Sequence, residues 1–204
     1  MKSPDAEKGK RGPTPRRLAR MRAVLARRQP DLTVVMENIH DAHNVSAIFR
    51  TCDAVGVSRV ELLYTLEPFP KIGKKSSSSA NKWLDRRRHR SVPECYGSLR
   101  SEGFRIYATR IGEGIPGLYE LDLTGSVALV FGNEHRGVSD DAASAADGVF
   151  QIPMMGMIES LNVSVAAAVA LYEALRQREA AGRYRSPEVA SQELDRRVED
   201  WIRR

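Results

Sequence analysis

The stretch Val127-Ala-Leu-Val-Phe-Gly-Asn-Glu-His-Arg-Gly-Val-Ser139 places five apolar residues directly before a polar turn. An uninterrupted apolar run of this length, bounded by turn residues, is typical of a strand buried on both faces of a sheet. Polar residues that follow such a strand lie at the carboxyl edge of a parallel sheet, where open α/β sheets bind ligands. The stretch therefore predicts an α/β fold with a ligand site near residues 131–139.

Short apolar runs alternate with helical patterns on both sides of this stretch. The patterns predict strands at 32–36, 60–64, 104–108, 127–131 and 149–152, and helices at 16–28, 47–55, 94–102, 161–181 and 187–204. Strands that alternate with helices favour a largely parallel sheet flanked by helices. Two further segments are predicted to be functional loops, a long basic loop at 65–82 and a Gly/Met loop at 152–164 that leads into the longest helix.

The net charge of +6 on these 204 residues is concentrated in two basic islands. Residues 1–30 hold ten Lys or Arg against two acidic residues, and residues 71–90 hold eight against one. This distribution favours a polyanionic partner, for which nucleic acid is the first candidate. The alternative is a solvated basic tail together with a solvated basic loop.

Composition excludes several other classes of protein. No run approaches the ~20 apolar residues of a membrane span, and no apolar segment follows the basic N-terminus, so we expect neither a membrane protein nor a secretory signal. Cys52 and Cys95 cannot build a disulfide framework, and we expect both to be core residues in a reducing cytoplasm.

Three common site motifs are poorly supported. Gly112, Gly114 and Gly117 spell G-x-G-x-x-G, but too few residues follow for the helix that a dinucleotide site requires. His40 and His43 form an H-x-x-H pair without the further ligands that a catalytic zinc needs, so we expect no metal and interpret both as satisfied or exposed histidines. A serine hydrolase lacks its G-x-S-x-G turn.

Polar residues at the predicted strand ends leave two interpretations open. Arg50 lies within an apolar helical pattern and needs an anionic partner there, either a ligand or a structural carboxylate such as Glu37 or Glu134. Ser160, Asn162 and Ser164 begin the longest helix, where one of them serves as N-cap and the others are free to bind a ligand.

Three ordered motifs then identify a resemblance. Residues 37–56, ENIHDAHNVSAIFRTCDAVG, residues 130–139, VFGNEHRGVS, and residues 152–166, IPMMGMIESLNVSVA, are similar to the motifs of the SPOUT superfamily of RNA methyltransferases, in its TrmH-type ribose 2′-O branch. The resemblance spans about residues 30–175. It implies that the α/β domain ends in a deep trefoil knot, which pattern analysis alone would not suggest because true knots are rare.

The resemblance also implies a cofactor and a set of site residues. S-adenosylmethionine would lie in the knot loops, with contacts carried over to Thr109, Gly132, Ile152, Met154 and Leu161. Apolar walls and the close approach permitted by Gly132 and Gly156 suit an adenine ring.

Arg50 is implied to be the catalytic residue that activates the ribose hydroxyl, with Asn44, Glu134, Ser160 and Asn162 orienting the reactants. Arginine hardly deprotonates in proteins, so the other interpretation is that Arg50 stabilises the developing alkoxide and positions the ribose.

Family members dimerise near the active site, so we expect a homodimer in which two subunits share the roles. We expect a basic N-terminal extension at 1–30, a methyltransferase domain at 31–182 and a helical tail at 183–204. These extensions resemble those of the enzymes that methylate guanosine 18 of tRNA. The expected RNA contacts lie in the two basic islands: Arg16, Arg17, Arg20, Lys74, Lys75, Lys82 and Arg86. The alternatives are the same chemistry on the tRNA wobble ribose or on ribosomal RNA, and a non-catalytic RNA-binding protein.

Overall fold

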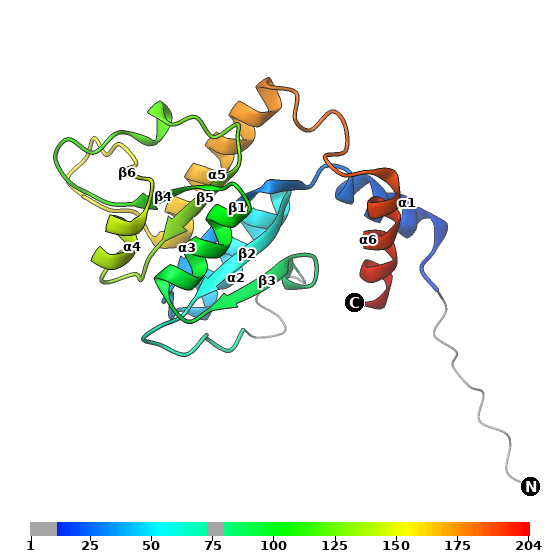
Figure 1. Cartoon of the computed structure of the whole chain (residues 1–204), viewed down its shortest axis with the longest axis horizontal. Coiled ribbons are helices and arrows are strands. Elements are labelled where there is room, and N and C mark those ends of the chain that lie inside the picture. Colours follow the sequence, from blue (N-terminus) through cyan, green and yellow to red (C-terminus); the bar gives the residue numbers. More distant parts are fainter. Residues whose placement is uncertain (1–11, 73–79) are drawn as a thin grey trace, which may run out of the picture.

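A single sheet of six parallel strands forms the centre of the protein in a computed structural model that describes residues 12–72 and 80–204 (Figure 1). The strand order is β3-β2-β1-β5-β4-β6, and every neighbouring pair is parallel. The strands are β1 (Gln29–Glu37), β2 (Val57–Leu63), β3 (Asp85–His89), β4 (Arg105–Thr109), β5 (Val127–Phe131) and β6 (Gly148–Phe150).

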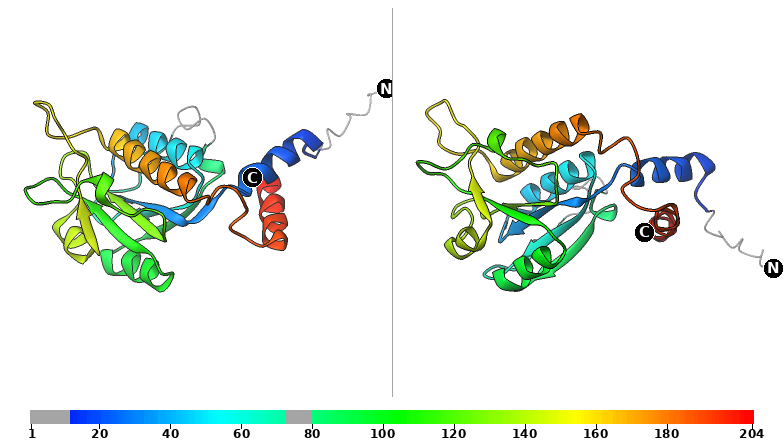
Figure 2. Two further views of the ribbon diagram at one scale, coloured as in Figure 1. Left: turned by 90° about the horizontal axis from the view of Figure 1, so that it is seen from above. Right: turned by 45° about the horizontal axis from the view of Figure 1, so that its top comes forward.

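Helices cover both faces of this sheet (Figure 2). One face carries α2 and α5, which contact each other, and the other carries α3 and α4. The helices are α1 (Pro15–Leu25), α2 (Ala42–Ala54), α3 (Val92–Ser101), α4 (Asp140–Ala145), α5 (Val163–Ala180) and α6 (Ser191–Arg203). Because the inner strands, such as β1 and β5, are apolar on both faces, each face of the sheet needs such a cover.

The central strand β5 contributes to both hydrophobic cores. Val127, Leu129 and Phe131 pack towards α2 and α5, whereas Ala128 and Val130 pack towards α3 and α4. This alternation is the period of two that a strand imposes on its side chains.

The terminal helices α1 and α6 pack on each other beside the sheet (Figure 1). Their small core contains Met21, Leu25, Leu194 and Trp201. The Trp201 ring lies 4.9 Å from that of Trp83, so the helix pair is attached to the segment that leads into β3.

The structure confirms the parallel α/β fold but contains two elements that the sequence patterns did not predict. β3 lies in the sequence Asp-Arg-Arg-Arg-His and forms an edge strand, where few apolar residues are needed. The helix α4 has only six residues, too few to show helical periodicity.

Both cysteines are free and buried, as expected, Cys52 in α2 and Cys95 in α3. Burial raises the pKa of each thiol to about 12, which keeps them inert. In the part of the chain that the structure describes, no helix is long and apolar enough to span a membrane.

The fully buried Arg178 fastens the end of α5 to the start of β1. Its guanidinium donates to Asp31 Oδ1 at 2.6 Å, to Gln29 Oε1 at 3.1 Å, and to the carbonyl oxygens of Leu123 and Gly125. A buried cation is tolerated only when its donors are satisfied in this way.

We expect Arg178→Met to lower the free energy of unfolding by about 3 kcal/mol, because Asp31 and two carbonyl groups lose a buried partner. Chemical denaturation measures this loss. The exposed Arg176, whose ion-pair partner among the described residues is Glu173 on its own helix, provides the control: Arg176→Met should change stability by less than about 1 kcal/mol. Equal effects of the two substitutions would contradict a special role for Arg178.

Candidate active site

A cavity with a volume of about 680 Å³ opens at the carboxyl edge of the sheet. It lies between the segment after β4, the turn after β5 and the loop between β6 and α5. All five residues expected at the cofactor line it, and so do three of the expected catalytic residues: Thr109, Gly132, Ile152, Met154 and Leu161, with Glu134, Ser160 and Asn162. The fold therefore brings together residues from three separate parts of the chain.

The carboxylate of Glu134 is the centre of the polar network at the cavity. Its Oε1 accepts hydrogen bonds from Asn44 Nδ2 at 2.9 Å and from the backbone N–H of Asp41 at 3.2 Å. Its Oε2 accepts from the backbone N–H of His40 at 3.3 Å and lies 2.9 Å from His40 Nδ1. These contacts join the turn after β5 to the start of α2.

The network continues from Glu134 to the start of α5. Asn162 Nδ2 donates to Asn44 Oδ1 at 3.1 Å, while Asn162 Oδ1 accepts from the backbone N–H of Ser164 and thereby caps the helix. Asn162 is thus the N-cap among the three polar residues at this helix start, and it also binds Asn44. One amide side chain links two helices that begin at the same edge of the sheet.

A left-handed turn at Asn38 directs the chain from β1 towards Glu134. Asn38 has a φ of 51°, a conformation that asparagine tolerates better than most residues. Its Oδ1 accepts from the backbone N–H groups of Thr65 and Leu66, and its carbonyl oxygen accepts from Asn133 Nδ2 at 2.8 Å. The strand ends of β1, β2 and β5 are therefore connected by two buried asparagines.

The structure gives a reason for glycine at position 132 that does not depend on a ligand. A Cβ atom on Gly132 would lie 2.1 Å from the backbone of Gly137, because the turn 133–137 closes on itself through two hydrogen bonds between Asn133 and Gly137. The turn itself thus requires Gly132, whatever ligand the cavity holds. At Gly156 a Cβ would meet nothing within 4 Å.

Arg50 is exposed to solvent, although the apolar residues around it in the sequence suggest a buried position. Its side chain is on the exposed face of α2, and within residues 12–72 and 80–204 it forms no ion pair. Glu37 instead accepts hydrogen bonds from Ser139, and Glu134 from the start of α2. Of the two interpretations left open for Arg50, the structure therefore does not contain the ion pair with Glu37 or Glu134. Six residues of helix place Arg50 ~9 Å along the axis from Asn44.

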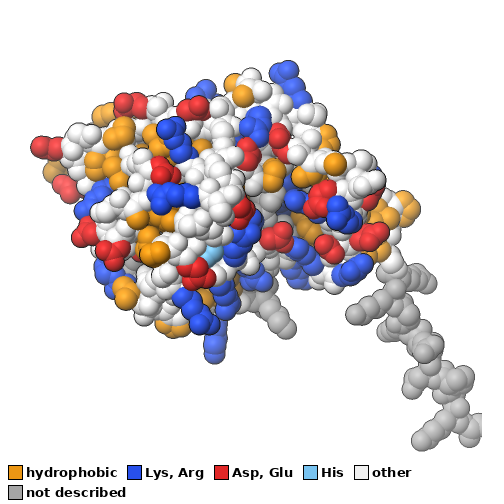
Figure 3. Space-filling model, viewed as in Figure 1, with side chains coloured by type: hydrophobic (Ala, Val, Ile, Leu, Met, Phe, Trp, Pro, Cys, Tyr) orange, Lys and Arg blue, Asp and Glu red, His pale blue; other side chains and the backbone are white. Residues whose placement is uncertain are grey.

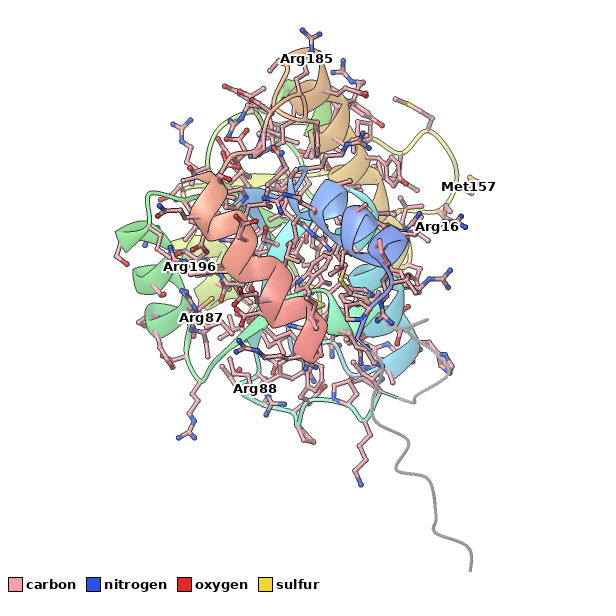
Figure 4. All side chains as sticks on the ribbon, turned by 90° about the vertical axis from the view of Figure 1, so that its right-hand side faces the viewer. Arg16, Arg87, Arg88, Met157, Arg185 and Arg196 are labelled. Atoms are coloured by element: carbon pink, nitrogen blue, oxygen red, sulfur yellow. The ribbon has the colours of Figure 1, made fainter. Side chains whose placement is uncertain are left out.

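Five of the seven expected RNA contacts are exposed side chains without ion-pair partners among the described residues: Arg16, Arg17, Arg20, Lys82 and Arg86. Figure 4 shows Arg16 on α1, with Arg196 on the neighbouring α6. Lys74 and Lys75 lie outside the described residues. Figure 3 shows lysine and arginine side chains projecting from the lower edge of the molecule, on the side where β3 lies in Figure 1.

The structure also describes the regions of the glycine motif and of the histidine pair. The glycines 112–117 are followed by a single turn of 3₁₀ helix, Leu118–Glu120, and then by β5, so no dinucleotide helix is present there. Across the described residues, no group of three or more His, Cys, Asp or Glu side chains could hold a metal ion.

Sequence reasoning missed the roles of Asn38, Asn133 and His40. Asn38 and Asn133 each stand one or two residues beyond a predicted strand, which was an available signal. Their function in holding loops together depends on which strands are neighbours, and no local pattern contains that information.

Burial by itself would raise the pKa of Glu134, but the hydrogen bonds from the Asn44 side chain and from the backbone N–H groups of Glu134, Asp41 and His40 outweigh it and lower the pKa. A carboxylate whose pKa is lowered on folding stabilises the protein above its unfolded pKa of ~4.3. This stabilisation is lost as the pH falls through the folded pKa.

We therefore expect Glu134→Gln to lower the midpoint of thermal unfolding at neutral pH, with a difference from wild type that shrinks below about pH 4. Calorimetric scans of both proteins between about pH 3 and pH 7 measure the difference. A difference that is independent of pH would show that the charge of Glu134 does not stabilise the fold.

Comparison with known proteins is consistent with this geometry. A tRNA (guanosine(18)-2′-O)-methyltransferase of Thermus thermophilus is 45% identical over 191 residues, which cover 94% of this chain and 98% of the relative. The structure of an Aquifex aeolicus TrmH/SpoU tRNA modifying enzyme superposes with a TM-score of 0.87 at 38% identity, covering 92% of this chain and 95% of that one.

A further relative was solved with its cofactor. The SpoU methyltransferase AviRb from Streptomyces viridochromogenes, in complex with AdoMet, has a TM-score of 0.65 at 27% identity and covers 74% of this chain and 62% of that one. Residues 31–172 match the SpoU rRNA Methylase family. This chain belongs to that family.

Proposed function

We propose that the protein transfers a methyl group from S-adenosylmethionine to the ribose 2′-hydroxyl of guanosine 18 in tRNA. The observation that carries this proposal is the cavity at the carboxyl edge, where the three motif segments meet around Glu134, Asn44 and Asn162. The Thermus relative, whose match covers 94% of this chain and 98% of its own length, supports the choice of substrate.

The cavity suits the cofactor in size and lining. Its volume of about 680 Å³ is within the range of ~300–1,000 Å³ that is usual for ligands of this size. Ile152, Met154 and Leu161 provide apolar walls, and Thr109 and Gly132 bring strand-end backbone groups to the opposite side. When bound there, S-adenosylmethionine supplies an electrophilic methyl group on a positively charged sulfur.

Arg50 acts in this proposal by stabilising the negative charge that develops on the ribose oxygen and by binding a substrate phosphate. Its exposed guanidinium has no carboxylate partner in the described part of the chain and so is free to bind an anion. Asn44, Glu134, Ser160 and Asn162 position the nucleotide at the mouth of the cavity. The position of Arg50, on the outer face of α2, favours a site completed by a second subunit.

We infer that the second subunit packs against α5 and the loop before it. Met155, Met157 and Ile158 on this loop are 95%, 99% and 64% exposed, and Val165 and Tyr172 continue the apolar surface along α5. Figure 4 shows Met157 at the outer edge of the loop, away from the rest of the protein. Large apolar side chains exposed on one loop and the helix that follows it favour a protein interface.

The two helical extensions, residues 1–30 and 183–204, are proposed to bind the tRNA around a methyltransferase domain at 31–182. The unpaired arginines of α1 and the exposed Lys82 and Arg86 supply cations for phosphate groups. Trp83 and Trp201 hold the helical pair next to the second basic island.

We also infer that the chain after β6 is threaded into a knot. The backbone of Gln151 exchanges hydrogen bonds with Pro116 and Leu118, and its side chain donates to the carbonyl of Ile115. Further along, Gln177 binds the backbone of Leu121 and Leu123. These contacts lay the segment between β4 and β5 against both the end of β6 and α5, which supports the inferred knot.

The function is tested by the transfer of labelled methyl from S-adenosylmethionine to unmodified tRNA transcript, with the product nucleotide mapped. We expect 2′-O-methylguanosine at position 18 and no product on a transcript in which guanosine 18 is replaced. Arg50→Ala should slow turnover by at least about 100-fold. Its affinity for the cofactor, measured by calorimetry, should be unchanged because Arg50 does not line the cavity.

Other outcomes decide between the alternatives. Methylation at the wobble ribose, or only of ribosomal RNA, would preserve the chemistry and refute the proposed substrate. Binding of RNA without any methyl transfer would indicate a non-catalytic RNA-binding protein. Loss of cofactor binding in Arg50→Ala would contradict the role given to this residue.

Tyr172→Asp is expected to convert the dimer to monomer, because a carboxylate would be buried in the interface without a partner. The affinity between the two subunits should fall by at least about 100-fold. Sedimentation velocity at several protein concentrations measures the change. Tyr119→Asp is the matched control, since Tyr119 is 60% exposed on the 3₁₀ turn rather than on α5. Equal behaviour of the two variants would refute α5 as the interface.

A further inference from the structure

The imidazole of His40 lies beside the main cavity and has no role in the scheme above. It lines a second cavity of about 510 Å³ together with Pro68, Phe69 and Pro70. The two cavities share Asn133, His135 and Arg136, so they adjoin along the turn after β5. The second cavity therefore offers space for a nucleoside beside His40 and next to the first cavity.

The carboxylate of Glu134 fixes the orientation of the His40 ring. Glu134 Oε2 lies 2.9 Å from His40 Nδ1 and also accepts from the backbone N–H of the same residue. Since a carboxylate only accepts hydrogen bonds, the neutral ring carries its proton on Nδ1. The lone pair of the ring is therefore on Nε2.

The Nε2 atom of His40 is available to a substrate. The His40 side chain is 48% exposed, whereas that of Glu134 is 14% exposed. Within residues 12–72 and 80–204, no protein atom forms a hydrogen bond with Nε2. The ring has a partly buried carboxylate at one nitrogen and no protein partner at the other among the described residues, which is the arrangement of a general base held by a carboxylate.

The backbone around His40 is held as firmly as its ring. The Tyr64 hydroxyl donates to the carbonyl oxygen of Ile39 at 2.7 Å, and Asn133 Nδ2 donates to that of Asn38 at 2.8 Å. Residues 38–40 are thus tied to the ends of β2 and β5. A base must be positioned in this way before it can contribute its full effect.

We infer that His40 is the general base that removes the proton of the ribose 2′-hydroxyl, with Glu134 orienting its ring. The inference rests on the proposed function. In this step the O–H bond breaks and its proton moves to Nε2. The oxygen forms a bond to the methyl carbon, the bond from that carbon to sulfur breaks, and its electron pair stays on the sulfur. The Glu134 carboxylate balances the charge of the resulting imidazolium.

This assignment removes a chemical difficulty with Arg50. A guanidinium is always charged in proteins and is a poor proton acceptor, whereas imidazole exchanges a proton near neutral pH. Arg50 then has only the electrostatic task that suits it.

Charged and titratable groups from three segments surround His40. They are Asp41 and His43 on its own segment, Glu67 and Lys71 after β2, and Glu134, His135 and Arg136 after β5. Arg136 pairs with Glu67, and the ring of His135 lies 5.5 Å from that of His40. Glu134 is the group that bonds His40 directly.

The first experiment is single-turnover methyl transfer to the tRNA transcript, with saturating cofactor, across the pH range in which imidazole titrates. The wild-type rate should rise with pH and level off, because the base works only when deprotonated. His40→Gln should be at least about 100-fold slower and lack this rise, while binding the cofactor normally. His43→Gln, which removes the other imidazole of the same motif, should keep the rise.

Two further outcomes separate this role from a structural one. Added imidazole should partly restore the rate of His40→Ala. A His40→Gln protein with the wild-type rate and pH profile would refute the inference while leaving the proposed function intact. A wild-type protein that is inactive on every RNA would overturn both.

The second experiment needs neither substrate nor cofactor. Nitrogen NMR of the full-length protein labelled in its histidines reports which ring nitrogen carries the proton. We expect the neutral His40 ring to be protonated on Nδ1 in wild type and to lose this preference in Glu134→Leu, with folding checked by the remaining spectrum. A ring protonated on Nε2 in the wild type would exclude His40 as the acceptor.

Discussion

The site depends on satisfying the partly buried carboxylate of Glu134. A carboxylate at this depth is stable only with several donors, and the protein supplies them from the backbone and side chains at the start of α2. Meeting that requirement determines where His40 and Asn44 lie relative to the turn after β5. Asn162 extends the same constraint to α5, so three loops from distant parts of the chain form one surface.

Different residues around α2 hold the loops in place and bind the substrate in the proposed mechanism. The amides of Asn44 and Asn162 and the carboxylate of Glu134 hold the loops in place, whereas Arg50 lies on the outer side of α2 without an ion-pair partner among the described residues. A guanidinium without an internal partner suits a negatively charged substrate. Because Arg50 does not line the cavity of its own subunit, we expect a second subunit to complete the site. The apolar surface of α5 lies on the neighbouring helix, which is consistent with an interface that brings Arg50 to the partner's cavity.

The proposed chemistry divides proton transfer from charge stabilisation. His40 is held between a carboxylate and solvent, which suits a group that must gain and lose a proton. Arg50 remains charged and suits the developing alkoxide. The adjacent cavity lined by Phe69 and two prolines provides a place for the nucleoside that both residues serve.

The amino-acid sequence by itself determined the parallel α/β class, all five of the strands that are rich in apolar residues, and the motifs that mark the family. These features are local, because periodicity and turn chemistry are written into neighbouring residues. The charged strand β3 and the short helix α4 escaped prediction because their structure depends on an edge position and on packing, not on periodicity.

Only the tertiary structure decided that Arg50 is exposed, that Glu134 binds the start of α2, and that Gly132 is required by its own turn. The first two depend on how helices and strand ends from distant parts of the chain pack together in the strand order β3-β2-β1-β5-β4-β6, and the third depends on the close approach of Gly132 to Gly137 in the folded turn.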